Sequence, residues 1–193
     1  MRWLIRIAAP ILTVLSFAAA QDGGWRLDKA HSSISFSISH MVISEVHGRF
    51  NDYEITFASS KEDFTDASVA ASIQVKSIDT GSEGRDRDLN SAKFFDAEKF
   101  PEIQFLSSSF KQVGENRYDI AGNLTIRDVT QLVTFHAVYR GMVKTQRGSV
   151  SAWKATLEIN RFDYGLKWNM MLDTGGLVAG EKVSITMDLE FRK

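Results

Sequence analysis

The chain has 193 residues, of which 44% are hydrophobic and 24% are charged, as expected for a soluble globular protein with one core or two small ones. The formal net charge is −1 and no basic cluster is present, which argues against a nucleic-acid-binding function. Cysteine is absent, which excludes disulfide bonds and any cysteine-linked lipid anchor.

Residues 1–20 have the pattern of a secretory signal peptide. Arg2 and Arg6 precede an apolar run over residues 7–17, and small residues follow at positions 18 and 20. The run is short for a membrane span, although an uncleaved anchor remains an alternative. Cleavage after Ala20 would leave residues 21–193, with 21 basic against 24 acidic residues and a net charge of −3. We therefore expect a secreted protein with no stable membrane insertion after cleavage.

The remaining chain consists mainly of segments in which apolar and polar residues alternate. This two-residue period is typical of strands with one buried and one solvated face, and it favours antiparallel pairing. Eight such strands are predicted, around residues 34–38, 50–57, 69–75, 103–105, 118–126, 133–139, 153–159 and 183–191. A change of parity in the second strand predicts a bulge near Asn51 and Asp52.

One segment, residues 85–94, is predicted to be helical, and Pro101 marks the break before the fourth strand. Residues 79–101 and 161–181 are long connections that carry many apolar side chains. Such loops must bury these side chains, either by plugging the ends of the fold or by lining the entrance of a pocket. We find no internal repeat and no linker, so residues 21–193 are predicted to form one domain.

Eight one-sided strands form either a closed barrel or two stacked sheets. Several of these strands have room for eight to eleven residues, which favours the tilted strands of a barrel. The interior of an eight-stranded barrel is filled by side chains or holds one small ligand. The predicted fold class is therefore all-β, an eight-stranded antiparallel barrel with one short helix in a long connection.

The four histidines do not form a recognisable metal site. His31 and His40 are nine residues apart, so in one strand they would point to opposite faces about 30 Å from each other. Zinc usually needs three or four converging ligands, and the sequence shows no such set, so no metal is expected. His40 continues the apolar parity of its strand, which predicts either an ordinary rim histidine or a polar anchor for a ligand head group.

Five stretches of the sequence resemble the YceI-like family of secreted, lipocalin-like proteins associated with polyisoprenoid binding. They are WRLDKAHSSISFSISH from residue 25, VHGRFNDYEITF from 46, RDRDLNSAKFFDAEKFPEIQF from 85, GNLTIRDVTQLVTF from 122 and INRFDYGLKWN from 159. One departure is His47 before Gly48, where a small or apolar residue is expected. The resemblance implies a lipocalin-like barrel, a periplasmic location, and a long apolar ligand such as a polyisoprenoid or an isoprenoid quinone.

The sequence therefore predicts a periplasmic binding or carrier protein for a long apolar lipid, with no enzymatic activity and no cofactor. The predicted wall residues are Phe36, Ile38, Ile73, Phe105, Phe135, Trp153, Leu157 and Met187. The predicted entrance residues are Phe94, Phe95, Trp168, Met170 and Met171, and the predicted head-group contacts are His40 and Arg87. Three alternatives stay open: an enzyme with His40 as acid/base, a ligand-free stress or interaction protein, and a homodimer that covers the apolar mouth.

Overall fold

The computed structural model describes residues 24–171 and 176–193. The predicted signal peptide and its cleavage point lie outside the described residues. The described strands are β1 (Gly24–Leu27), β2 (Ser33–His40), β3 (Ser44–Phe50), β4 (Tyr53–Ala58), β5 (Ser68–Gln74), β6 (Ile78–Asp79), β7 (Glu102–Gly114), β8 (Arg117–Ile126), β9 (Val129–Thr145), β10 (Gly148–Asn160) and β11 (Ala179–Arg192). The α-helix α1 is Glu83–Asn90, and short 3₁₀ turns are η1 (Lys29–His31), η2 (Val75–Ser77) and η3 (Arg161–Tyr164).

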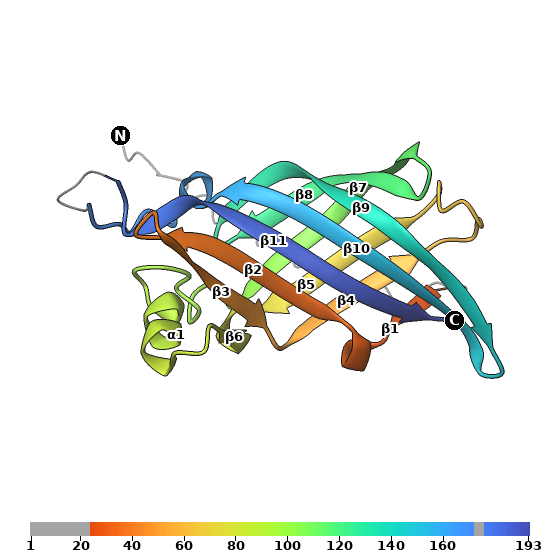
Figure 1. The fold of residues 1–193 in the computed structure, drawn as a ribbon, viewed down its shortest axis with the longest axis horizontal. Coiled ribbons are helices and arrows are strands. Elements are labelled where there is room, and N and C mark those ends of the chain that lie inside the picture. Colours follow the sequence, from red (N-terminus) through yellow and green to blue (C-terminus); the bar gives the residue numbers. More distant parts are fainter. Residues whose placement is uncertain (1–23, 172–175) are drawn as a thin grey trace, which may run out of the picture.

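The strands close into a barrel of eight antiparallel strands (Figure 1). Three of the eight barrel strands are each made of two consecutive segments with a short break between them. These pairs of segments are β1 with β2, β3 with β4, and β5 with β6. Thus β2 pairs with β3 and β1 pairs with β4, while β1 also pairs with β11 and closes the barrel. The eight predicted strands and the predicted fold class are confirmed.

Two details of the sequence prediction are refined by the structure. The parity change near Asn51 and Asp52 corresponds to the break between β3 and β4. The helix begins at Glu83 and ends at Asn90, rather than spanning residues 85–94. After Asn90 the chain forms turns, and the amide of Phe95 donates to the carbonyl of Leu89. In this conformation the ring of Phe94 packs against that of Trp168, with 5.2 Å between the ring centroids.

An aromatic cluster fills one end of the barrel. Phe64, from the loop between β4 and β5, is 5% exposed and packs edge-on against Trp153 and Tyr139, with ring centroids 5.0 and 5.1 Å away. The hydroxyl of Tyr118 donates to the carbonyl of Asp63 and holds this loop in place. The loop therefore plugs this end, which we call the closed end.

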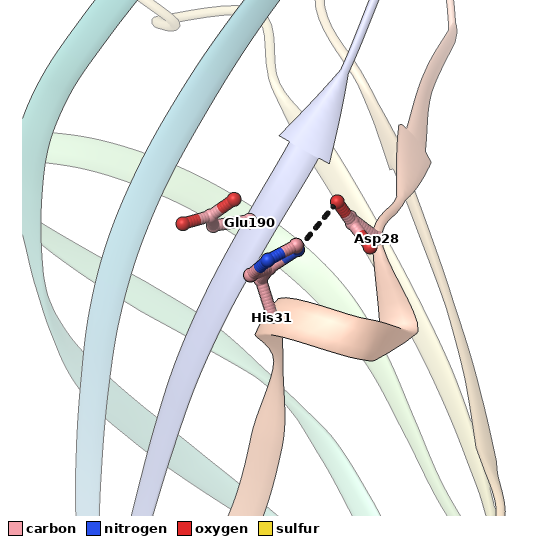
Figure 2. A group of neighbouring side chains, drawn as sticks. All are labelled: Asp28, His31 and Glu190. Atoms are coloured by element: carbon pink, nitrogen blue, oxygen red, sulfur yellow. Dashed lines mark hydrogen bonds and ion pairs between the residues drawn. The ribbon is translucent and has the colours of Figure 1, made fainter.

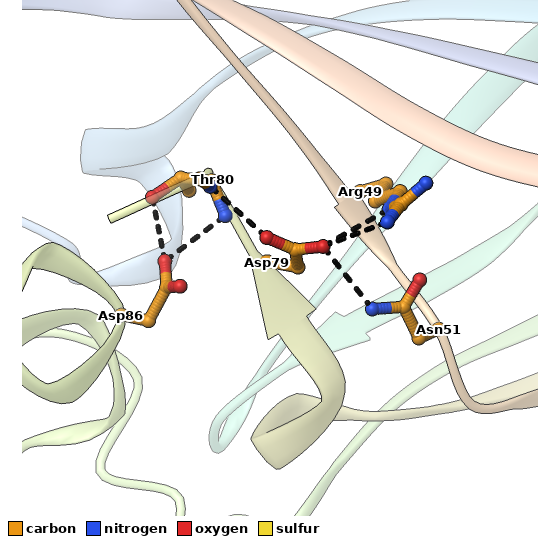
Figure 3. A network of polar contacts seen from close by, with 6 residues as sticks. Arg49, Asn51, Asp79, Thr80 and Asp86 are labelled. Atoms are coloured by element: carbon orange, nitrogen blue, oxygen red, sulfur yellow. Dashed lines mark hydrogen bonds and ion pairs between the residues drawn. The ribbon is translucent and has the colours of Figure 1, made fainter. Parts of the chain in front are cut away.

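The helix α1 lies at the opposite end, beside the β2–β3 hairpin (Figure 1). A polar network fixes the chain that leads into it (Figure 3). Asp79 on β6 accepts two hydrogen bonds from Arg49 on β3, at 2.9 and 3.1 Å. One residue later, the amide of Thr80 donates to the carboxylate of Asp86 on α1 at 3.0 Å. The backbone amide of Gly81 and then Arg49 lower the pKa of Asp79, so this carboxylate stays ionised well below neutral pH. Within the described residues, no helix is long and apolar enough to cross a membrane.

Candidate functional site

A cavity of about 540 Å³ lies inside the barrel, between α1 and the middle of the strands. Its walls come from inward-facing positions of several strands. On β2, Ile34, Phe36, Ile38 and His40 line it at alternate positions, as expected for the inward face of a strand, and Ser35 and Ser39 also contribute to its lining. The exposed side chain of Lys93 also lines it, so the cavity opens at the α1 end, which we call the mouth.

The structure brings most of the predicted ligand-contact residues together around this cavity. Nine of the fifteen line it: Phe36, Ile38, His40, Ile73, Phe94, Phe95, Phe135, Trp168 and Met187. Whether each contacts a ligand stays a prediction, but their convergence on one space is a property of the fold.

The other six predicted residues lie outside the main cavity. Phe105 and Trp153 line a second, smaller cavity of about 60 Å³ nearer the closed end. Leu157 is half-buried against the core and lines neither space. Met170 and Met171 are exposed, with 59% and 76% of their surface accessible.

Arg87 is the sixth, and the helical period explains its position. Arg85, Asp88 and Leu89 line the cavity, so they occupy one face of α1, and Arg87 falls on the opposite face. Its guanidinium lies 3.7 Å from Glu83, and both side chains are mostly exposed. The arginine of α1 that lines the cavity is therefore Arg85, which donates to the hydroxyl and carbonyl oxygens of Thr80 at 2.7 Å each.

An aromatic pair lies where the two cavities adjoin, a region whose shared lining residues also include Ile73, Ile103 and Leu124. Phe105 on β7 and Phe135 on β9 pack edge to face, with ring centroids 5.0 Å apart. Phe135 and Met187 line both cavities. The pair therefore narrows the interior between the mouth and the closed end.

Gly48 on β3 makes room for one of the wall residues. It lies opposite Phe36 on β2, and a Cβ atom built on Gly48 would be 2.3 Å from the Cζ atom of Phe36. The ring of Phe36 therefore lies directly over the backbone of β3. Any side chain at residue 48 would push this ring from its place in the cavity wall.

Arg161 is a buried cation beside the mouth that the sequence did not single out. It is 5% exposed and lines the cavity. Its guanidinium donates to the carbonyls of Gly180 at 2.7 Å, Trp168 at 2.8 Å and Ala179 at 3.1 Å, and also to that of Leu166. Burial lowers the pKa of Arg161. Arg161 thus ties the segment that carries Trp168 to the start of β11.

His40 lies at the rim, in a part of the cavity wall that is half-buried. Between residues 24 and 171 and from 176 onward, neither imidazole nitrogen of His40 has a hydrogen-bond partner.

Three potential metal ligands meet elsewhere, near the N-terminal end of the described chain. The ligand atoms of Asp28, His31 and Glu190 lie within 4.8 Å of one another (Figure 2). The carboxylate of Asp28 accepts from the His31 ring at 2.9 Å and from the Nε of Arg192 at 2.6 Å. Arg192 and His31 already pair with the carboxylate of Asp28, so these contacts account for the proximity of the three residues without a metal ion.

The apolar residues that surround the mouth include six that are exposed. We call them the mouth ring: Met41, Val42, Ile43, Trp168, Met170 and Met171. The first three form the turn between β2 and β3, and the amide of Met41 donates to the carbonyl of Val178 at 2.9 Å. The amide of Val178 donates in turn to the carbonyl of Met170 at 2.9 Å, so the two segments lie side by side.

Sequence reasoning missed several residues of the main cavity. Besides Arg85 and Arg161, they include Val46, Phe50 and Ile78. The apolar ones lie at inward-facing positions of their strands, so strand parity was a usable signal for them. The two arginines had no such signal, because their positions depend on the packing of α1 and η3 at the mouth.

The comparisons with known proteins agree with this architecture. The family model for the YceI-like domain matches residues 25–191. The UPF0312 protein SAS2572 of Staphylococcus aureus is 34% identical over 166 residues, which cover 85% of this chain and 94% of that protein. The UPF0312 protein SA2479 of the same species is 35% identical over the same shares.

Solved structures share the fold at lower sequence identity. The crystal structure of BcnA from Burkholderia cenocepacia matches with a TM-score of 0.74 and 24% identity, over 85% of this chain and 98% of that one. A polyisoprenoid binding domain from Saccharophagus degradans, implicated in plant cell wall breakdown, matches with a TM-score of 0.68 and 16% identity, over 88% and 98%. The extent of the family match and the identity to these relatives together show that the chain belongs to the YceI-like family.

Proposed function

We propose that this protein binds a long apolar ligand inside its barrel and carries or sequesters it in the periplasm. The observation that carries the proposal is the cavity of about 540 Å³, which is walled mainly by aliphatic and aromatic side chains. Its charged lining residues, Arg85, Asp88, Lys93 and Arg161, all lie at or near the mouth. This distribution favours a ligand with an apolar body and a polar head. The periplasmic location rests on the signal peptide pattern and on the family resemblance.

The volume bounds the length of the buried chain. A water-sized group occupies about 30 Å³ in a liquid, so the cavity accommodates roughly 18 methylene-sized groups. This corresponds to between three and four isoprene units, or to one long acyl chain. A longer chain would have to pass the Phe105–Phe135 pair or extend out of the mouth.

Burial of such a chain supplies enough free energy for stable binding. At about 0.8 kcal/mol per methylene-sized group, three isoprene units contribute roughly 12 kcal/mol. The loss of the ligand's translational and rotational freedom on binding costs about 4–15 kcal/mol, which is similar to this gain. Each further isoprene unit inside the barrel therefore raises the net affinity. Binding of this kind requires no catalytic group.

The comparisons support an isoprenoid as the first ligand to test. One of the structural neighbours is titled a polyisoprenoid binding domain, although its identity of 16% indicates a shared fold only. An isoprenoid quinone or a polyprenyl lipid therefore heads the candidates, as the sequence resemblance also implies.

The two rival functions have less support in the structure. A ligand-free barrel would be expected to have its interior filled by side chains, whereas a large cavity is present here. An enzyme with His40 as acid/base would be expected to orient that ring, and the described residues offer it no hydrogen-bond partner.

The direct test is mass spectrometry of an organic extract from the mature protein, purified from its native compartment without detergent. We expect one apolar species at close to one molecule per chain. A clean extract that stays clean after incubation with quinones and polyprenyl lipids would contradict the proposal.

A pair of variants on β2 links the ligand to the cavity. Ile38→Trp places a large ring in the cavity wall, whereas Ser37→Trp places the same ring on the outer face of the same strand. We expect the first variant to lose the extracted ligand and the second to retain it. Equal ligand content in both variants would show that the ligand binds elsewhere.

A further inference from the structure

The side chains of the mouth ring form an apolar surface that is exposed to solvent. Val42, Ile43 and Met171 are 69%, 87% and 76% exposed. Scattered apolar residues are normal on a protein surface, but six from two adjacent segments at one end of the molecule form a patch. Patches of this kind mark contacts with proteins or membranes.

The patch is continuous with the interior of the barrel. Trp168 is 37% exposed and also lines the cavity, and it packs against Phe94, which lines the cavity as well. The ring therefore surrounds the route by which an apolar ligand would enter or leave. A partner that covers the ring would also cover the mouth.

Cations lie beside these aromatic residues. Lys93 precedes Phe94, Lys167 precedes Trp168, and both lysines are exposed. Within residues 24–171 and 176–193, neither of them has an ion-pair partner. Two exposed carboxylates, Glu45 and Glu181, lie at the same end, so the attraction to phosphates is local to the two lysines that adjoin the apolar ring. Lysines beside apolar side chains are typical of a surface that meets both phosphates and acyl chains.

We propose that the mouth ring docks this protein on the surface of a bilayer that contains anionic phospholipids. The apolar tips enter the boundary between head groups and acyl chains, and Lys93 and Lys167 contact the phosphates. A second copy of this chain is a poorer occupant, because a symmetric mouth-to-mouth dimer would bring the lysines of one copy towards those of the other across an apolar contact.

The test measures co-sedimentation of the mature protein with large unilamellar vesicles. One set contains phosphatidylethanolamine and phosphatidylglycerol, the other phosphatidylcholine alone, and neither contains an isoprenoid. We expect the wild type to bind the anionic vesicles more tightly than the neutral ones. The double variant Val42→Asp/Ile43→Asp is expected to bind them about a hundredfold more weakly, since burial of each of the two side chains is worth about tenfold in affinity.

The matched control is Met142→Asp/Val143→Asp. These two side chains are also exposed, at 45% and 65%, but they lie on β9 near the β9–β10 turn, away from the mouth (Figure 1). This variant should bind vesicles as the wild type does. Lys93→Glu/Lys167→Glu should lose the preference for anionic over neutral vesicles while it keeps the folded-state circular dichroism spectrum.

Three outcomes would overturn the proposal: no binding of the wild type to anionic vesicles, equal binding of the wild type and the Val42/Ile43 variant, or loss of binding in the β9 control. A wild-type dimer that the Val42/Ile43 variant converts to a monomer, without vesicle binding by either, would instead identify the ring as a contact between copies. The ligand extraction described above is independent of this test, so vesicle binding without a ligand, or a ligand without vesicle binding, shows which of the two proposals fails.

Discussion

The turn between β2 and β3 has a backbone conformation that its residues disfavour. Met41 and Val42 have φ values of +52° and +67°, and the amide of Ile43 donates to the carbonyl of His40 to close the turn. Hairpin turns with positive φ at both central residues prefer Asn followed by Gly. Elsewhere in this barrel, the turn between β7 and β8 has Asn116 at its positive-φ position.

We predict that Met41→Asn/Val42→Gly stabilises the protein. A left-handed conformation costs a residue with a Cβ about 1–2 kcal/mol, so Val42→Gly gains about that much. Met41→Asn gains about half as much, because Asn keeps a Cβ but tolerates this conformation better than Met does. The new glycine reduces this gain by about 1 kcal/mol, because glycine increases the conformational entropy of the unfolded chain. Little burial is lost, because Met41 and Val42 are 42% and 69% exposed. The expected net gain is about 0.5–2 kcal/mol, or a rise in Tm of roughly 1–8 °C for a chain of this size.

Scanning calorimetry on the mature protein measures this effect, and Val42→Ala is the control. Alanine keeps the Cβ and hence the strain, but it removes most of the apolar bulk. We expect the control to leave Tm within a degree or two of the wild type, while both variants bind anionic vesicles more weakly. An unchanged or lower Tm in Met41→Asn/Val42→Gly would refute the reasoning from backbone strain.

Three further predictions concern the interior and the polar network. Phe105→Leu should widen the passage to the second cavity, so that mass spectrometry of extracts detects a longer chain than in the wild type; an unchanged chain length would show that the aromatic pair does not limit it. Gly48→Ala should push Phe36 into the cavity and weaken binding of a fluorescent long-chain probe, because the displaced ring would occupy space that the probe needs; unchanged affinity would mean that the ring moves elsewhere. Asp79→Asn should lower Tm at neutral pH, because the lowered pKa of Asp79 stabilises the folded state above the carboxyl's ordinary pKa, and this stabilisation is lost as pH falls through the folded-state pKa. The difference in Tm between variant and wild type should therefore shrink as the pH falls below the carboxyl's ordinary pKa, and a constant difference would point to a purely steric effect.

The strands were predictable from the sequence because each has one buried and one solvated face, which produces alternating apolar and polar residues. The period fades where both faces are exposed, so the far ends of the long strands were not predicted. For example, β9 extends to Thr145, whereas alternation indicated a strand only to Tyr139. Phe64 was missed for a related reason, because a single loop residue that plugs a barrel end has no periodic neighbours.

The site was predictable only in part, because parity gives the face of a strand but not the depth along the barrel. Phe105 and Trp153 face inward as Ile73 does, but they line only the smaller cavity nearer the closed end, whereas Ile73 lines both cavities. Arg87 and Arg85 differ by two positions on a helix, so the choice between them required the orientation of α1. Depth and helix orientation are set by strand tilt and tertiary packing, which no local pattern records.

Both ends of the barrel have large apolar residues with positive φ, but these residues are buried at one end and exposed at the other. At the closed end, Phe64 has a positive φ of +57°, and the unfavourable backbone is offset because the ring is buried among other aromatic rings. At the mouth, Met41 and Val42 have the same unfavourable backbone, but their side chains are 42% and 69% exposed, and the turn is held by hydrogen bonds from the amides of Met41 and Ile43 rather than by burial of aromatic rings. Locally unfavourable choices of this kind persist where function requires them. The strain at the mouth is thus an argument, independent of the lysines, that the mouth ring is maintained for contact with a surface outside the molecule.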